Sequence, residues 1–248
     1  MGAPYWLKPD SLAFPPASLA CDDPPGLLAV GGDLSPDRLL TAYSLGIFPW
    51  FDDTSPILWW SPDPRMVLEP AKVHVSRSMR RFIQRNCGPE GSLRISMDEN
   101  FAGVIRYCAS LRQHREGTWI TEDMQNAYQE LHRLGFAHSL EVWQQDESGR
   151  ERLVGGLYGI ALGRMFFGES MFSLLPNVSK LAFIALANQL RNWEFTLIDC
   201  QLPTDHLASL GANPISRDSF LRLLAENRPY IDTITASHWQ ISDTLRLG

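Results

Sequence analysis

Residues 165–201 carry the pattern that most limits what this chain can fold into. The run "MFFGESMFS" predicts an apolar strand, "NVSKLAFIALANQLRNW" predicts a long apolar helix with Ser179 as a possible N-cap, and "FTLIDCQL" predicts a short buried strand. A right-handed strand–helix–strand crossover makes the two strands parallel and allows them to be neighbours in one sheet. This segment therefore predicts an α/β fold in which a long helix crosses a central sheet.

The preceding residues extend this pattern. One helix is expected to open near Asp98, and another is expected over "TEDMQNAYQELHRLG" with Thr121 as its N-cap. Two further strands are predicted over "AHSLEVWQQ" and "RLVGGLYGIALG", with the polar turn "DESGRE" between them. These elements add strands and helices to the same central sheet.

The first 64 residues have a different composition. They are rich in proline, glycine, aspartate and tryptophan, and they predict one helix that begins after Ser35 and stops at Gly46. Most of their aromatic side chains are expected in a core, although Trp50, in the proline-flanked run "FPWF", is a candidate stacking surface for a base. We therefore predict a small N-terminal α/β domain over residues 1–64 and a larger domain over residues 65–248.

Carboxylates stand among apolar residues in both strands of the 165–201 segment. Strict alternation places Glu169 on one face of its strand, together with Met165, Phe167 and Met171. It places Asp199 and Gln201 on one face of the other strand, with Cys200 pointing away. If the strands are neighbours, Glu169, Asp199 and Gln201 meet at one site. Because buried carboxylates are costly unless they are paired or used, this predicts a functional site, with satisfied buried groups or a partner for Arg164 as the alternative.

The net charge of −6 conceals one basic segment. Residues 72–115 carry nine basic and three acidic side chains. Within them, a helix capped by Ser76 would present a basic face made of Arg77, Arg80, Arg81 and Arg85. Its opposite face would be apolar, with Met79, Phe82 and Ile83. The pattern fits a solvated helix surface or a phosphate-rich partner, and arginine suits phosphate through its planar fork.

Several classes of protein are disfavoured by composition. The four cysteines are far apart, which argues against a zinc site and a disulfide framework. No apolar run is long enough to span a bilayer, and the first residues do not resemble a secretory signal. The sequence contains no Gly-x4-Gly-Lys-Ser/Thr loop. We expect a soluble cytoplasmic protein without a metal ion.

Eight motifs occur in a recognisable order: "GGDLS", "GIFPWF", "WWSPDPR", "EGTWIT", "AHSLEVW", "FGESMFS", "LIDCQ" and "HLASLGA". Together they resemble the leucyl/phenylalanyl-tRNA–protein transferase family over residues 10–220, approximately. The resemblance implies a bacterial cytoplasmic enzyme that moves Leu or Phe, and Met less well, from aminoacyl-tRNA to a protein whose N-terminus is Arg or Lys. The product would carry an N-terminal signal for degradation. It also implies a monomer whose larger domain has a GNAT-like acetyltransferase fold with a central mixed sheet.

The resemblance bears on cofactors and on catalysis. Related folds hold coenzyme A at a glycine-rich turn before the long helix, whereas "LLPNVSK" contains no glycine here. Since the aminoacyl ester on tRNA is already activated, no cofactor is expected. The family pattern implies that Asp199 and Gln201 lie at the catalytic centre, where a carboxylate can assist proton removal and an amide can steady developing charge. We hypothesise that Glu169 receives the cationic N-terminus of the acceptor.

Binding residues are implied in the same way. Family positions near the Leu or Phe side chain correspond to Phe166, Met171 and Leu157, the last replacing a methionine that is common in the family. Positions that contact the terminal adenosine correspond to Trp50 and Trp119. The phosphates of the tRNA acceptor stem would be held by Arg77, Arg80, Arg81 and Arg85.

Two alternatives stay open from the sequence. One is an acyltransferase or hydrolase that uses Cys200 as nucleophile with His206 as base. The other is a non-catalytic RNA-binding module, which would use the basic helix and the tryptophans and would leave Glu169, Asp199 and Gln201 unexplained.

Overall fold

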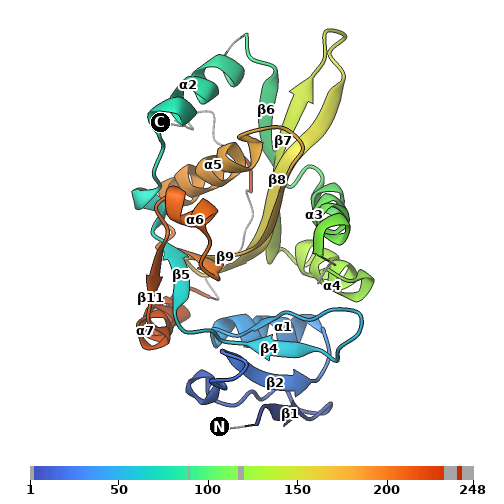
Figure 1. The fold of residues 1–248 in the computed structure, drawn as a ribbon, viewed down its shortest axis with the longest axis vertical. Helices are drawn as coiled ribbons and strands as arrows, with labels where there is room; N and C mark the ends of the chain where they lie inside the picture. Colours follow the sequence, from blue (N-terminus) through green and yellow to red (C-terminus); the bar gives the residue numbers. More distant parts are fainter. Residues whose placement is uncertain (1–2, 89, 117–119, 232–238, 242–248) are drawn as a thin grey trace.

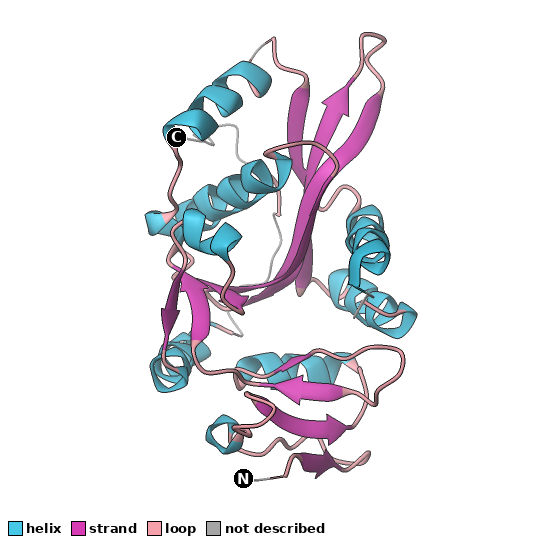
Figure 2. Ribbon diagram, in the orientation of Figure 1, coloured by secondary structure: helices cyan, strands magenta, loops and turns pink. Residues whose placement is uncertain are grey.

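Two β-sheets dominate the computed structural model, which describes residues 3–88, 90–116, 120–231 and 239–241. A four-stranded sheet has the order β1-β2-β4-β3, and a seven-stranded sheet has the order β11-β5-β10-β9-β8-β7-β6. In Figure 1 the small sheet lies at one end of the molecule, and helix α1 separates it from the large sheet. Figure 2 shows helices on both sides of the large sheet.

The small sheet is built by the first 60 residues. Its elements are β1 (Tyr5–Leu7), a 3₁₀ turn (Ala17–Leu19), β2 (Leu27–Gly31), α1 (Pro36–Ser44), β3 (Phe48–Pro49) and β4 (Leu58–Trp60). The predicted helix is confirmed, because Ser35 is its N-cap residue and Gly46 follows its end with a φ of +77°.

The large sheet holds the remaining strands. In spatial order they are β11 (Asn213–Ile215), β5 (Arg65–Leu68), β10 (Leu197–Gln201), β9 (Met165–Ser173), β8 (Glu151–Leu162), β7 (Ala137–Gln145) and β6 (Leu93–Met97). β9 and β10 are parallel neighbours, while the other adjacent pairs are antiparallel. The predicted α/β class with a central mixed sheet is confirmed, as is the parallel β9–β10 pair.

Helices cover the two faces of the large sheet. They are α2 (Arg77–Asn86), α3 (Phe101–Glu116), α4 (Glu122–Arg133), α5 (Val178–Asn192), α6 (Asp205–Ser209) and α7 (Arg217–Asn227), with 3₁₀ turns at Pro70–Lys72 and Arg228–Tyr230. Figure 1 places α3 and α4 on one face, and α5 on the other. Among the described residues, no helix is both long and apolar enough to cross a membrane.

The predicted caps of α2 and α4 are confirmed, whereas that of α5 is wrong. Ser76 and Thr121 each accept a hydrogen bond from a backbone N–H in the first turn, as expected. Ser179 is not the cap of α5, because Asn177 occupies that position with a φ of +68°. The helix expected near Asp98 begins at Phe101, since Asp98 adopts a φ of +58°.

The two sheets share buried side chains. Tyr43, Phe48 and Trp59 of the small sheet region belong to the same apolar cluster as Tyr128 of α4 and Phe167 of β9. Tyr43 and Phe167 form an edge-to-face ring pair with centroids 5.4 Å apart. The domain division at residue 64 therefore stays a prediction.

A buried ion pair of the large sheet also contacts the region of the small sheet. Arg65 Nη2 and Nε donate to the Asp199 carboxylate at 2.6 and 2.8 Å, and the side chains are 1% and 0% exposed. Arg65 Nη1 also donates to the Gly46 carbonyl at 3.2 Å. Its guanidinium lies between the rings of Phe48 and Phe220, at 4.7 and 4.6 Å from their centroids. The arginine thus contacts the end of α1, β3, β10 and α7.

Arg65→Leu should lower the free energy of unfolding by about 3–5 kcal/mol, because Asp199 would remain buried and unpaired. The double variant Arg65→Leu/Asp199→Leu should lose less than the sum of the single variants. Urea unfolding measures all three. Arg94→Leu is the control, since its partly exposed ion pairs should contribute about 1 kcal/mol or less. Additive losses in the double variant would contradict a coupled pair.

Candidate active site

A cavity of about 310 Å³ opens beside β9 and β10. Its apolar wall includes Leu157, Phe166, Met171, Phe183, Leu186 and Ile198. Glu169 and Gln201 provide polar groups, and Trp50, 40% exposed, lies at the surface of the same cavity. The structure therefore brings together every predicted member of the aminoacyl and adenosine sites except Trp119, which lies outside the described residues.

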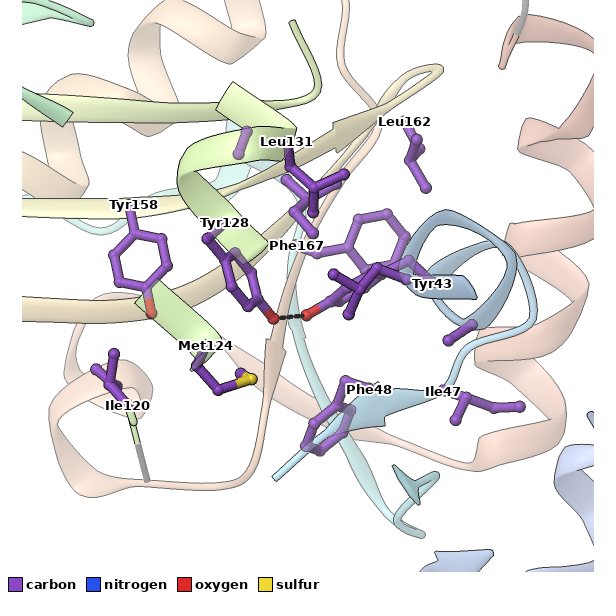
Figure 3. Close-up of a cluster of buried hydrophobic side chains, with 14 of the residues drawn as sticks. Tyr43, Ile47, Phe48, Ile120, Met124, Tyr128, Leu131, Tyr158, Leu162 and Phe167 are labelled. Atoms are coloured by element: carbon purple, nitrogen blue, oxygen red, sulfur yellow. Dashed lines mark hydrogen bonds between the residues drawn. The ribbon is translucent and has the colours of Figure 1, made fainter. Parts of the chain in front are cut away.

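Glu169 sits at the centre of a hydrogen-bonded cluster. Tyr43 Oη of α1 donates to its Oε1 at 2.7 Å, and Tyr128 Oη of α4 donates to its Oε2 at 2.9 Å. Gln201 Nε2 of β10 donates to Oε1 at 2.8 Å. The two tyrosine hydroxyl groups also contact each other, and Figure 3 shows them pointing toward one another across the cluster.

Burial is the main influence on the charge of Glu169, which is 7% exposed. Desolvation raises the pKa of its carboxyl group from 4.5 to about 7, with a smaller rise from the negative charge of Asp199. The bonds from Tyr43, Tyr128 and Gln201 favour the carboxylate and limit the rise. Near neutral pH the carboxyl group is therefore balanced between its two protonation states.

Two β-bulges shape the site. In the β8–β9 pair, Tyr158 faces Ser170 and Gly159 faces Gly168, so Glu169 is the extra residue. In the β10–β5 pair, Asp199 faces Val67 and Gln201 faces Met66, which leaves Cys200 as the extra residue. Gln201 has a φ of +62°.

The bulges overturn two predictions that assumed strict alternation. Met171 does not share a face with Phe167: it packs against the buried cluster of Phe166, whereas Phe167 belongs to the opposite cluster. Cys200 does not point away from Gln201, since both line the cavity. An extra residue reverses the alternation of all side chains beyond it, and the sequence pattern alone contains no sign of this.

Asp199 has a different place from the other two predicted catalytic residues. It is fully buried and does not line the cavity. Both of its oxygens accept hydrogen bonds from Arg65, and Oδ1 also accepts one from the backbone N–H of Gln201 at 2.9 Å. The three residues are linked as predicted, but only Glu169 and Gln201 reach the cavity. The alternative that Glu169 pairs with Arg164 is wrong, because Arg164 pairs with Glu194.

The alternative nucleophile has an unfavourable setting. Cys200 and His206 both line the cavity, but burial raises the pKa of the Cys200 thiol far above its ordinary value. Burial also lowers the pKa of His206. Within the described part of the chain, Cys200 Sγ donates a hydrogen bond to the Ile198 carbonyl, at 3.9 Å, and no hydrogen bond joins it to His206.

The basic helix has the predicted two faces. Met79 and Ile83 of α2 are buried. The exposed face carries Arg77, Arg80, Arg81 and Arg85. Across the residues that the structure describes, none of these four arginines forms an ion pair with an acidic side chain, so the face is available to an anionic partner.

Sequence reasoning missed Tyr43, Tyr128 and Arg65. The two tyrosines lie at apolar helix positions, where an aromatic residue normally belongs to the core. Arg65 had a usable signal, because it opens the apolar run "RMVL" directly after two prolines in the motif "WWSPDPR". An arginine at the start of a strand that is otherwise buried requires a buried partner.

Comparison with known sequences identifies the family of this chain. A family model described as leucyl/phenylalanyl-tRNA protein transferase matches residues 67–225, and a model of its N-terminal domain matches residues 32–63. A leucyl/phenylalanyl-tRNA–protein transferase of Pseudomonas fluorescens (strain Pf0-1) is 56% identical over 90% of this chain and 94% of its own length. That of Pseudomonas entomophila (strain L48) is 53% identical over 94% of this chain and 98% of its own length. That of Cellvibrio japonicus (strain Ueda107) is 54% identical over 88% of this chain and 89% of its own length.

Solved structures are more distant. The crystal structure of FemX is 11% identical and covers 76% of this chain and 70% of that chain, with a TM-score of 0.46.

Glu169→Gln should change the pH dependence of stability. Because the folded-state pKa of about 7 exceeds the ordinary value of 4.5, the wild-type carboxyl group stabilises the fold fully below pH 4.5 and loses this contribution as the pH rises through 7. The stability of the variant relative to wild type should therefore rise by about 3 kcal/mol between pH 4.5 and 8. Urea unfolding across this range measures the difference, and a flat difference would show that folding does not raise the pKa of Glu169.

Proposed function

This chain belongs to the leucyl/phenylalanyl-tRNA protein transferase family, and we propose from that premise how its cavity transfers an aminoacyl group from tRNA to a protein. The supporting observation is the position of Glu169 and Gln201 at the polar side of an otherwise apolar cavity. A non-catalytic RNA-binding role would leave this arrangement without a purpose, and the family assignment makes the chain an aminoacyltransferase.

The reaction is attack of an amine on an ester. The acceptor α-amino group is mostly protonated at neutral pH, because its ordinary pKa is about 7.7–8.0. It loses one proton, its nitrogen bonds to the ester carbonyl carbon, and the bond from that carbon to the ribose oxygen of tRNA breaks. The second proton passes from the attacking nitrogen to the leaving ribose oxygen. The aminoacyl ester supplies the driving force, and the protein must hold the ester and the amine together.

The apolar wall suits the acyl side chain. Leu157, Phe166 and Met171 are buried or half-buried around the cavity, and among the described residues that line it Glu169 is the only one with an acidic or basic charge at neutral pH. A Leu or Phe side chain would leave water on binding there, which favours it by roughly 1.5–3 kcal/mol. Trp50 would stack on the terminal adenosine at the cavity mouth.

Glu169 and Gln201 would act on the reacting groups. The carboxyl pKa of about 7 lets Glu169 hold the acceptor ammonium as a carboxylate and take up its first proton. The Gln201 side-chain amide, fixed on Glu169, would steady the developing charge. Asp199 would act as a positioning residue, because it holds the Gln201 backbone and does not reach the cavity.

The acceptor and tRNA complete the proposal. We propose an acceptor protein with N-terminal Arg or Lys, since a second positive charge would be favoured near a buried carboxylate. Addition of Leu or Phe to that terminus would mark the protein for degradation. The exposed arginines of α2 would hold tRNA phosphates without reading its sequence, so Leu-tRNA and Phe-tRNA would both be accepted. We also propose a monomeric enzyme that works in the cytoplasm, where charged tRNA is found.

The first experiment combines the protein, Leu-tRNA and a short peptide that begins with Arg, beside an identical peptide that begins with Ala. Mass spectrometry should find leucine added only to the Arg peptide. Gln201→Ala should lower kcat/KM for the Arg peptide by about 10²-fold or more with unchanged tRNA binding. Gln129→Ala, on the exposed face of α4, is the matched control. No addition to either peptide by folded wild-type protein would contradict the proposal.

The arginine face of α2 makes a separate prediction. Changing any one of Arg77, Arg80, Arg81 or Arg85 to Ala should weaken tRNA binding and reduce the slope of log K against log salt concentration by about 1, because one phosphate contact is lost. Arg222→Ala on α7 is the control and should leave the slope as in wild type. Unchanged slopes in all four variants would assign tRNA binding to another surface.

A further inference from the structure

We propose that Trp239 is a positioning residue for the acyl side chain. Its indole holds the ring of Phe166 in the wall of the cavity, and so it limits how large a side chain the enzyme prefers. The inference rests on the proposed function of this cavity as the aminoacyl site. It assigns a role to a residue beyond α7 and beyond residue 225, where the match to the family model ends.

Trp239 is buried against aromatic rings from three parts of the fold. It is 7% exposed, and its ring stacks on His138 of β7 with centroids 3.7 Å apart and an interplanar angle of 7°. Its centroid lies 6.1 Å from that of Phe166 on β9. It also meets Trp193 and Phe195, beyond the end of α5, at 5.0 and 6.1 Å. The indole therefore fills the space between the large sheet and the chain that follows α5.

Phe166 has little freedom on its other sides. Its side chain is 1% exposed and lines the cavity. Its ring lies over Gly159 of β8 so closely that a Cβ atom at that position would come within 2.6 Å of it. The ring cannot approach β8 further, which leaves the cavity on one side and Trp239 on another. The position of this part of the cavity wall therefore depends on the indole.

The support behind the indole is itself fixed. His138 Nδ1 lies 2.7 Å from Asp98 Oδ2, and His138 Nε2 lies 3.1 Å from the Gly135 carbonyl oxygen. Asp98 Oδ1 accepts the Ser139 backbone N–H at 2.7 Å. Asp98, His132 and His138 could together offer ligand atoms to a metal ion, but each already has a hydrogen bond within the fold. We read the cluster as the support that orients His138, and thereby Trp239.

Removing the indole should change the preference of the enzyme between Phe-tRNA and Leu-tRNA. A loss of stability alone would lower the activity with both substrates equally. In Trp239→Leu the Phe166 ring can move back from the cavity, so the pocket becomes larger and fits leucine less closely. A difference of a few methylene groups in an apolar pocket changes kcat/KM by about 10-fold or more. The ratio of kcat/KM for Phe-tRNA to that for Leu-tRNA should therefore rise by about 10-fold.

The ratio is the decisive measurement, because the fraction of folded enzyme cancels from it. Both substrates are assayed with the same Arg peptide and the same enzyme preparation, using wild type, Trp239→Leu and the milder Trp239→Phe. Trp143→Leu is the matched control, a partly buried tryptophan of β7 that belongs to the opposite apolar cluster and does not line the cavity. Its ratio should equal that of wild type.

A double variant tests whether Trp239 acts through Phe166. Phe166→Leu enlarges the same wall directly, so adding Trp239→Leu should change the ratio little further. Unchanged ratios in both Trp239 variants, an equal change in Trp143→Leu, or additive changes in the double variant would overturn the inference. Absence of transfer by the wild-type protein would instead reject the proposed function on which the inference rests.

Discussion

The Arg65–Asp199 ion pair is the interaction on which the rest of the structure depends. Two opposite charges without water are tolerated only when their hydrogen-bonding capacity is met. Here the pair is completed by the Gly46 carbonyl, the rings of Phe48 and Phe220, and the Gln201 backbone N–H. Those partners come from two parts of the chain that are far apart, residues 46–48 and residues 201–220. The pair therefore fixes the point where α1, β5, β10 and α7 meet, and Gln201 takes its position from it.

The two buried carboxylates at this site, Asp199 and Glu169, have contrasting environments. Asp199 is paired with Arg65 and does not line the cavity, whereas Glu169 accepts hydrogen bonds from two tyrosines and Gln201 and reaches it. Burial also raises the pKa of Tyr43 and Tyr128 well above its ordinary value, so both phenols keep their protons over the physiological range. Glu169 and Asp199, which Gln201 links, thus have different environments, and the proposed function gives them separate tasks for that reason.

The sequence predicted the parts of this protein that follow regular periodicity. Parallel β9 and β10, the caps at Ser76 and Thr121, and the basic face of α2 all follow from local patterns. The predictions failed where one residue departs from the repeat, at the bulges of Glu169 and Cys200 and at the left-handed Asn177. Tyr43 and Trp239 could not be assigned at all, because their partners lie 126 and 73 positions away in the chain. Only packing between distant segments brings those two side chains to the groups that they contact.

The bond from Tyr43 to Glu169 has a consequence during synthesis on the ribosome. Tyr43 emerges early, while its carboxylate partner and Gln201 emerge much later. The cavity can acquire the Gln201 side chain, and with it the complete polar site, only after β10 has left the exit tunnel and joined β5. A nascent chain surrounded by charged tRNA therefore carries an arginine-rich helix long before it carries a finished site. The site is therefore completed late in synthesis, and an incomplete chain cannot transfer the aminoacyl group of the tRNA around it.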